Sequence, residues 1–314
     1  MSAPDLSIVI CTHNRVDYLK LVLDALHAQC EVLDELEIIV VDNASSDGTA
    51  ELCSGHAITR APVVFSYVYE PSIGLSQARN TGVEVSRGGI VAFLDDDAIP
   101  DPGWAASLRS AFLGERVGAA GGEVVLAYEV RRPDWLTDVL ELYLTRVDWG
   151  SEPRAIDLVS EWVAGANIAF RRSLLQQHPF DTSLGRKGAS LISGEETQLC
   201  RRIAQDGWTT AWVPAARVVH HIPAARATKA YLRRRAYAGG YSAVLVDRRL
   251  GESQDRIRTF VRGAKTVITG CLRLCDPRRS SAEHAEASVL AYSGAGTAVA
   301  AIVGWRLGER RTSA

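Results

Sequence analysis

Apolar and polar residues alternate in two rhythms along the first hundred residues, and these rhythms predict strands and helices in turn. Short runs rich in β-branched residues, such as LSIVIC at Leu6–Cys11, are too short for a buried helix and predict strands. Between these runs, apolar residues recur every three or four positions, as they do from Tyr18 to Leu26, and predict helices. The remaining predictions are strands at Leu36–Val41, Val63–Tyr69 and Ile90–Leu94, a helix after Asp42–Gly48 capped by Ser45 or Ser46, and a helix at Leu75–Ser86.

This alternation predicts an α/β fold with a mostly parallel, Rossmann-like sheet and helices on both faces. Polar clusters follow three of the strands: THNR after the first, DN after the second and the triplet Asp95–Asp97 after the fourth. Ligands of such sheets bind beyond the carboxyl ends of the strands. We therefore expect the three clusters to converge on one binding site. The adjacent carboxylates of the triplet repel one another and need an offset, which is either open solvent or a cation.

The pattern is looser after Asp101. Apolar spacing predicts an amphipathic helix over Asp134–Trp149, and another helix begins near Ser193-Gly194-Glu195-Glu196. A short strand at Arg217–Val219 leads to His220, and strand alternation directs His221 to the other side.

Charge is unevenly distributed along the 314 residues, although the whole chain carries only −2. Residues 226–279 contain 14 Lys and Arg against 4 Asp and Glu, a local charge of +10, so the rest must carry −12. The rest of the chain is acidic, which argues against nucleic acid as a partner. No basic leader precedes the first strand and the cysteines show no framework spacing, so we expect a cytoplasmic protein.

Residues 287–305 are uncharged for 19 positions, which is near the minimum for a spanning helix. They are rich in Ala and Gly, so a helix packed inside the protein is the alternative. Together with the basic segment upstream, this stretch suggests peripheral contact with an anionic membrane through residues 226–305, on its inner face.

Four motifs in this order carry a resemblance to a known family: SIVICTHNR, IIVVDNASSDGT, GLSQARNTGVEVSRGGIVAFLDDD and SGEETQLCRRI. Together they resemble a family-two glycosyltransferase of the GT-A type, similar to bacterial transferases of polysaccharide and glycoconjugate assembly. The resemblance implies an inverting transfer from a nucleotide-diphosphate sugar that uses Mg²⁺ or Mn²⁺. The acceptor would be a glycan, a lipid-linked molecule or a small molecule. We expect a GT-A domain over residues 1–225, with a nucleotide-sugar half (about 1–100) and an acceptor half (about 101–225), and a basic helical extension over 226–314.

The resemblance also implies roles for individual residues. Asp97 would ligate the metal, with Asp95 and His220 as further candidates, and Asp95 would lie near the ribose. A segment containing Trp162 and Asn167 resembles the acceptor side. The residues implied around the nucleotide are Thr12, Asn14, Arg15, Asp42, Asn43, Arg79, Asp95 and Asp96.

Inverting transfer needs a carboxylate to take the proton of the acceptor hydroxyl. The candidates are Glu195 and Glu196, and the resemblance favours Glu196, although the family more often has Asp there. Alternatively, Ser193-x-x-Glu196 is a capping box, and Glu196 only stabilises the start of the helix. At the level of function the alternatives are a nucleotidyltransferase acting on a sugar phosphate and an inactive nucleotide-sugar binding protein.

Overall fold

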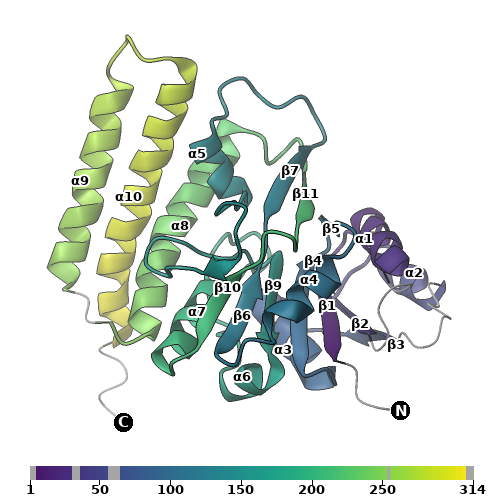
Figure 1. Cartoon of the computed structure of the whole chain (residues 1–314). Helices are drawn as coiled ribbons and strands as arrows, with labels where there is room; N and C mark the ends of the chain where they lie inside the picture. Colours follow the sequence, from purple (N-terminus) through teal and green to yellow (C-terminus); the bar gives the residue numbers. More distant parts are fainter. Residues whose placement is uncertain (1–4, 30–35, 56–63, 253–254, 309–314) are drawn as a thin grey trace. The chain divides into compact units, whose positions relative to one another are not determined.

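A computed structural model describes residues 5–29, 36–55, 64–252 and 255–308 of the chain (Figure 1). The chain divides into two compact units. The first contains residues 1–127, 145–183 and 199–221, and the second contains residues 128–144, 184–198 and 222–314. The second unit therefore combines the C-terminal region with two segments from the middle of the chain.

The first unit is built on an eight-stranded sheet with the strand order β3-β2-β1-β4-β9-β6-β10-β8. Strands β1 to β4 pair in parallel, and β6 pairs in parallel with β10, whereas β9 and β8 are antiparallel to their neighbours. A second, three-stranded sheet has the order β5-β11-β7. The strands are β1 Leu6–Thr12, β2 Leu36–Asp42, β3 Val64–Tyr69, β4 Ile90–Asp95, β5 Ala98–Pro100, β6 Val117–Gly121, β7 Val124–Tyr128, β8 Arg154–Ala155, β9 Asn167–Arg171, β10 Thr209–Trp212 and β11 Val218–Ile222.

Both faces of the large sheet are covered, as the fully apolar strands predict. Ile8 and Ile10 pack with Leu19 and Leu23 of helix α1 (Val16–Gln29) in one core cluster. Val9 points to the other face and packs with Ala78 of helix α3 (Leu75–Val85) in a second cluster. The α/β class with a mostly parallel sheet is therefore confirmed. Of the strand predicted at Val63–Tyr69, Val63 lies outside the described residues.

The helix after β2 begins later than the sequence predicted. Helix α2 spans Thr49–Gly55, so neither Ser45 nor Ser46 caps it. Asp47 instead accepts hydrogen bonds from the backbone N–H (3.1 Å) and the hydroxyl (2.5 Å) of Thr49. The prediction was wrong because an aspartate two residues before the helix provides the same kind of acceptor as a serine. The other helices of this unit are α4 Trp104–Ala111 and α6 Arg172–Gln177, while α7, Glu195–Gln205, begins in the second unit.

The helix predicted over Asp134–Trp149 is mostly absent. The structure has only α5 (Asp138–Glu141) and a 3₁₀ turn, η1 (Leu142–Leu144). Thr145 has a φ of 78°, which a continuing α-helix does not allow. Val147 then pairs with Val124 as an isolated bridge. The apolar periodicity was real, since Leu136, Leu140 and Leu144 are buried, but the backbone turns after each short piece.

The C-terminal region of the second unit forms the helices α8 (Lys229–Arg249), α9 (Arg256–Leu274) and α10 (Ser281–Gly308). Helix α10 packs against both α8 and α9. Glycines allow the backbones to approach closely. A Cβ added at Gly240 of α8 would lie 2.0 Å from the carbonyl oxygen of Ser293 in α10.

Helix α10 is long and apolar enough to cross a membrane over Ser281–Val303, judged by length and composition alone. Its mean hydropathy is 1.3, and 44% of its most apolar window is buried inside the protein. The structure does not describe the side chains of residues 304–308. The end of the apolar stretch 287–305 falls among them.

Two adjacent glycines of α8 provide a matched test of this packing. Gly240→Ala is expected to destabilise the protein by about 1–3 kcal/mol, because the new methyl group would overlap a backbone carbonyl that side-chain motion cannot relieve. Gly239→Ala has nothing within 4 Å of its new Cβ. It is expected to stabilise the helix by up to about 1 kcal/mol. Urea unfolding of the two variants measures both changes, and equal shifts would contradict the packing.

Candidate functional site

The register of the parallel strands brings the polar clusters together. Strand β1 lies between β2 and β4, with Thr12 opposite Asp42 and Cys11 opposite Asp95. The carboxyl ends of the three strands therefore meet at one edge of the sheet, as the sequence predicted.

The acidic triplet is held by cationic and hydroxyl partners. Asp95 ends β4 and keeps a partly exposed side chain, while Asp96 and Asp97 are 5% and 2% exposed. Nη1 of Arg15 donates to Oδ1 of Asp96 (2.9 Å) and to Oδ2 of Asp97. The hydroxyl of Thr12 donates to Oδ2 of Asp96 at 2.8 Å. In this state an arginine therefore offsets the like-charge repulsion.

Charge and burial act against each other at this cluster. Burial raises the pKa of Asp96 to about 6, and the charge of Asp97 adds to the rise, while Arg15 opposes it. Burial would lower the pKa of Arg15, but the two carboxylates outweigh it and raise that pKa well above its usual value. Two buried carboxylates thus share one arginine beside the partly exposed Asp95, and this excess of negative charge favours the approach of a further cation.

His220 reaches the same carboxylates from the second sheet. Strand β11 pairs antiparallel with β5, which places His220 opposite Ala98. Its Nε2 lies 3.1 Å from Oδ1 of Asp97, and both side chains are buried. Its Nδ1 is buried and has no hydrogen-bond partner within the described residues. His221 points the other way, as strand alternation predicted, and its ring contacts Tyr18.

Asn14 and Asn43, which were also predicted to lie around the nucleotide, hold the loops at this edge in place. Asn14 has a φ of 54°, and its Oδ1 accepts the backbone N–H of Ser46 at 2.7 Å. Asn43 donates to the carbonyl of Ser72 (2.8 Å) and accepts from the backbone N–H of Gly74 (2.8 Å).

Asp42 is buried and accepts two hydrogen bonds at the same edge. One comes from the hydroxyl of Tyr67 and the other from the backbone N–H of Ser45, both at 2.8 Å. Burial and the Asp42 contact raise the pKa of Tyr67 to about 12, so Tyr67 stays a hydrogen-bond donor at neutral pH.

Arg79, which the resemblance placed around the nucleotide, is buried. It is 2% exposed and lies over the rings of Phe93 and Phe180. Its Nη2 donates to the carbonyl of Gly165 (2.9 Å) and lies 3.4 Å from Oδ1 of Asp95. A Cβ at Gly165 would lie 2.7 Å from that nitrogen. The absence of a side chain at 165 thus lets the arginine connect the acidic triplet to the segment around residue 165.

The segment resembling an acceptor side has a mainly structural environment. Asn167 is fully buried, and it accepts from Nε1 of Trp104 (2.8 Å) and donates to the carbonyl of Ala216 (2.7 Å). The carbonyl of Trp162 accepts from Nε1 of Trp149 at 2.7 Å, and the two rings meet edge to face.

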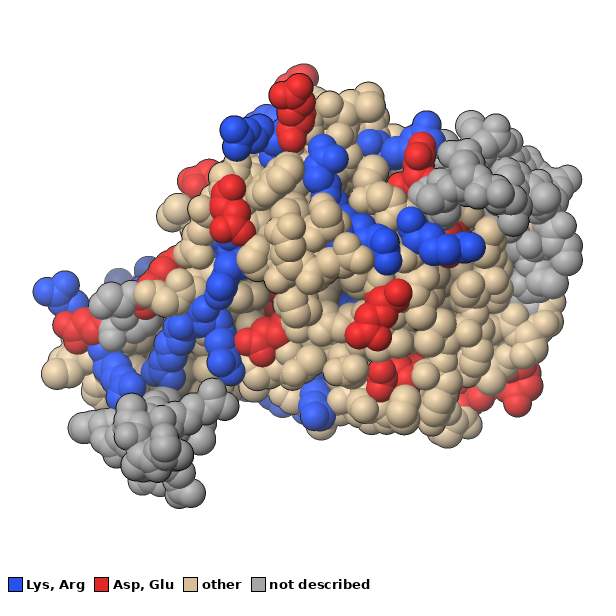
Figure 2. All heavy atoms as spheres, turned by 90° about the horizontal axis from the view of Figure 1, so that it is seen from below, with Lys and Arg blue, Asp and Glu red and all other residues tan. Residues whose placement is uncertain are grey.

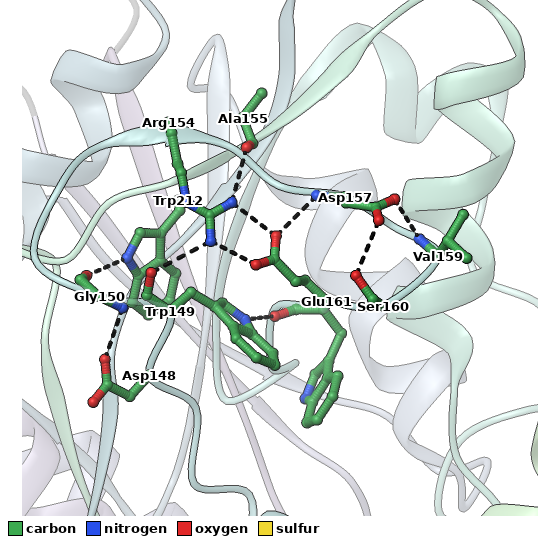
Figure 3. Close-up of polar contacts among 11 residues, drawn as sticks. Asp148, Trp149, Gly150, Arg154, Ala155, Asp157, Val159, Ser160, Glu161 and Trp212 are labelled. Atoms are coloured by element: carbon green, nitrogen blue, oxygen red, sulfur yellow. Dashed lines mark hydrogen bonds and ion pairs between the residues drawn. The ribbon is translucent and has the colours of Figure 1, made fainter.

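The loop before Trp162 is fixed by a contact that sequence reasoning missed. Arg154 donates two hydrogen bonds, of 2.8 and 2.5 Å, to the carboxylate of Glu161 (Figure 3). Nε1 of Trp212 donates to the carbonyl of Gly150 at 2.7 Å. Arg154 and Glu161 are seven residues apart in an irregular loop. No pattern in the sequence distinguishes such a pair from ordinary charged residues at the surface.

The two candidate bases lie at the start of α7, in the second unit. Gly194 precedes the helix with a φ of 95°, so Ser193 is not directly before the first helical residue as a capping box requires. The backbone N–H of Ser193 donates to the hydroxyl of Ser242 at 3.0 Å. Glu195 is 3% exposed, whereas Glu196 is half-buried.

Arg235 of α8 lies beside this helix start and was not identified from sequence. Its Nη1 donates to the hydroxyl of Ser193 at 3.0 Å. Burial and the neighbouring charge of Arg186 lower the pKa of Arg235, while the charges of Glu196 and Glu195 raise it. Both glutamates therefore lie close enough to Arg235 for their negative charges to act on its guanidinium.

The donor atoms present fit a divalent cation that is only partly held by protein. Oδ1 of Asp97 and Nε2 of His220 converge at 3.1 Å, so an oxygen and a nitrogen that can both ligate a cation lie side by side. Within the described ranges, no three His, Cys, Asp or Glu side chains are grouped to hold a metal by themselves. Mg²⁺ is commonly bound in this way, by one or two side chains completed by substrate phosphates and water.

The chain matches one family model and several known proteins. The family described as "Glycosyl transferase family 2" matches residues 7–178. Glucosyl-dolichyl phosphate glucuronosyltransferase of Haloferax volcanii is 25% identical over 83% of both chains. Succinoglycan biosynthesis protein ExoM of Rhizobium meliloti is 26% identical, over 75% of this chain and 72% of its own.

Among solved structures, a mannosyltransferase of Pyrobaculum calidifontis in complex with GDP-Man and Mn²⁺ is similar, with a TM-score of 0.59. It is 23% identical, and the alignment covers 98% of this chain and 76% of that one. This likeness concerns the fold, and it agrees with the GT-A architecture expected from the sequence.

Proposed function

The chain belongs to glycosyl transferase family 2 and is a glycosyltransferase, and we propose that it is an inverting, metal-dependent one. It moves a sugar from a nucleotide-diphosphate sugar to a hydroxyl of a glycan, a lipid-linked molecule or a small molecule. The observation that supports this most is the convergence of Asp97, His220 and Arg15 at the carboxyl edge of the parallel strands.

Asp97 and His220 would hold a Mg²⁺ or Mn²⁺ ion, with Asp95 beside them at the end of β4. When bound, the cation supplies positive charge that neutralises the diphosphate leaving group. Arg15 contributes a second positive charge at the same place, and its guanidinium can transfer hydrogen bonds from the carboxylates to a phosphate. Thr12 keeps Asp96 in position throughout.

The nucleotide contacts are proposed at the same edge. Asp42, Asn43 and Asn14 shape the loops that follow β1 and β2, and their polar atoms border the strand ends where a nucleotide of an α/β sheet binds. Arg79 positions Asp95 by its contact with that carboxylate.

Glu196 is our proposed base, which takes the proton of the acceptor hydroxyl as the anomeric carbon is attacked from the opposite face. Its half-exposed position lets it meet an acceptor, whereas Glu195 is nearly inaccessible. Arg235 places a positive charge beside this carboxylate.

Incubation with a panel of UDP-, GDP- and dTDP-sugars in the presence of Mn²⁺ tests this function. We expect one donor to release nucleoside diphosphate, by transfer or by slow hydrolysis, and the product to have the opposite anomeric configuration by NMR. Release of pyrophosphate would identify a nucleotidyltransferase instead, and binding without turnover would identify an inactive binding protein.

A further inference from the structure

Helix α9 buries small residues and exposes large apolar ones, which is the reverse of what a helix of a water-soluble protein usually does. Its buried positions are Thr259, Gly263 and Gly270, all of them small. A Cβ at Gly263 or Gly270 would lie 2.7 Å from backbone atoms of α10. The helix is therefore attached to α10 by close backbone contact, and its large apolar side chains are left on the outside. Small residues inside and large apolar residues outside are typical of helices that pack in a membrane environment.

The outer apolar residues form one stripe, which we call the α9 stripe. Ile257, Val261, Ile268 and Leu272 are 75%, 41%, 58% and 68% exposed. They follow one another at intervals of four, seven and four residues, so they lie along one side of the helix. Counting Phe260 and Leu274, α9 contains six of the 18 exposed large hydrophobic residues of the described chain. An apolar surface concentrated in this way marks an interaction site.

The charge of the same helix is entirely positive. The stripe is accompanied by five exposed basic residues, and residues 256–274 contain no Asp or Glu. Figure 2 shows a band of Lys and Arg side chains on the face of the molecule that is drawn there. The five are Arg256, Arg258, Arg262, Lys265 and Arg273.

We propose that α9 is an in-plane membrane anchor, with the α9 stripe inserted among the acyl chains of an anionic leaflet and its basic residues at the phosphate headgroups. An apolar stripe flanked by Lys and Arg is the arrangement of interfacial helices, whose long basic side chains reach up to the headgroups. The net charge of +5 on one helix favours an anionic lipid surface over a protein partner of mixed charge.

The same contacts favour α9 over the more apolar helix α10 as the main anchor. Helix α10 packs against both α8 and α9, and nearly half of its most apolar window is covered by protein. The contacts of Gly263 with Ala298 and of Gly270 with Ala291 show that α9 and α10 run antiparallel. The exposed residues Ile302 and Val303 of α10 therefore lie towards the Ile257 end of α9. This proposal goes beyond the transfer reaction and does not depend on it.

Flotation of the full chain with lipid vesicles tests the anchor. The wild type is expected to float with vesicles of phosphatidylcholine and phosphatidylglycerol at low salt, and to bind pure phosphatidylcholine vesicles much less. Ile268→Asp combined with Leu272→Asp should lower vesicle affinity at least about 100-fold, because two apolar side chains no longer insert. Each of Arg258→Gln, Arg262→Gln and Lys265→Gln should lower the affinity for anionic vesicles roughly fivefold.

Leu113→Asp is the matched control. Leu113 is 86% exposed in the first unit, so its change adds a charge to an exposed apolar site outside α9 and should leave flotation unchanged. The α9 variants should also keep donor hydrolysis at the wild-type rate, which separates this proposal from the transfer reaction. Equal flotation of the wild type and the α9 double variant would overturn the anchor. It would also be overturned by light scattering that shows a dimer which the double variant dissociates, because the stripe would then bind a second copy of the chain.

Discussion

Asp97→Asn is expected to lower the rate of glycosyl transfer by a factor on the order of 100 to 1,000 or more, with the fold intact. The substitution removes the buried negative charge that meets both Arg15 and His220. A neutral amide is a poorer ligand for a hard divalent cation, so the charge of the leaving diphosphate would no longer be neutralised. Arg15 keeps Asp96 as a partner, so we expect only a small change in melting temperature.

The matched control for this variant is Asp101→Asn. Asp101 follows strand β5 and pairs with Arg217 at 2.7 Å, at a partly exposed position. Its loss should leave transfer almost unchanged. Calorimetry with Mn²⁺ and nucleoside diphosphate provides a second measurement, in which only Asp97→Asn should weaken metal binding. If Asp97→Asn keeps wild-type turnover and metal affinity, the proposed metal ligand is wrong.

Glu196→Gln is expected to lower the transfer rate by about 100-fold to 10,000-fold while the affinity for donor and metal stays the same. The glutamine keeps the size of the side chain but cannot accept the proton of the acceptor hydroxyl. Steady-state rates with saturating donor, together with donor affinity by calorimetry, separate the two quantities.

Glu195→Gln is the matched comparison, because it makes the same change one residue earlier. Glu195 is buried, so we expect its loss mainly to reduce stability. A reversal, with transfer lost in Glu195→Gln and kept in Glu196→Gln, would assign the base to Glu195. Near-native turnover of Glu196→Gln with a lower melting temperature would show that this residue only stabilises the helix start.

The sequence predicted the parallel half of the fold and the edge of the site, since both depend on local patterns. Buried strands read as apolar runs, and polar residues at their ends are visible as THNR, DN and DDD. It did not predict the backbone turn at Thr145, because an apolar spacing of four persists although no continuous helix forms. Nor did it predict the start of α2 at Thr49, where several residues in a row could cap a helix.

Contacts between residues distant in sequence could not be predicted either, because they do not depend on local patterns. Arg79 is buried only because Phe93, Phe180 and Gly165 come together around it. Arg235 lies 42 residues from Ser193, and no local pattern links them. The sequence showed α9 only as part of a basic segment. Whether the apolar residues of the α9 stripe are exposed depends on which side of the helix packs against α10.

In the proposed reaction, transfer depends on a divalent cation held at the carboxyl edge of the sheet. The most direct test is the turnover of the wild-type enzyme, with its identified donor, in excess EDTA and again after Mn²⁺ is restored. We expect EDTA to lower turnover by at least about 100-fold and Mn²⁺ to restore it in full. Undiminished turnover in excess EDTA would contradict the claim.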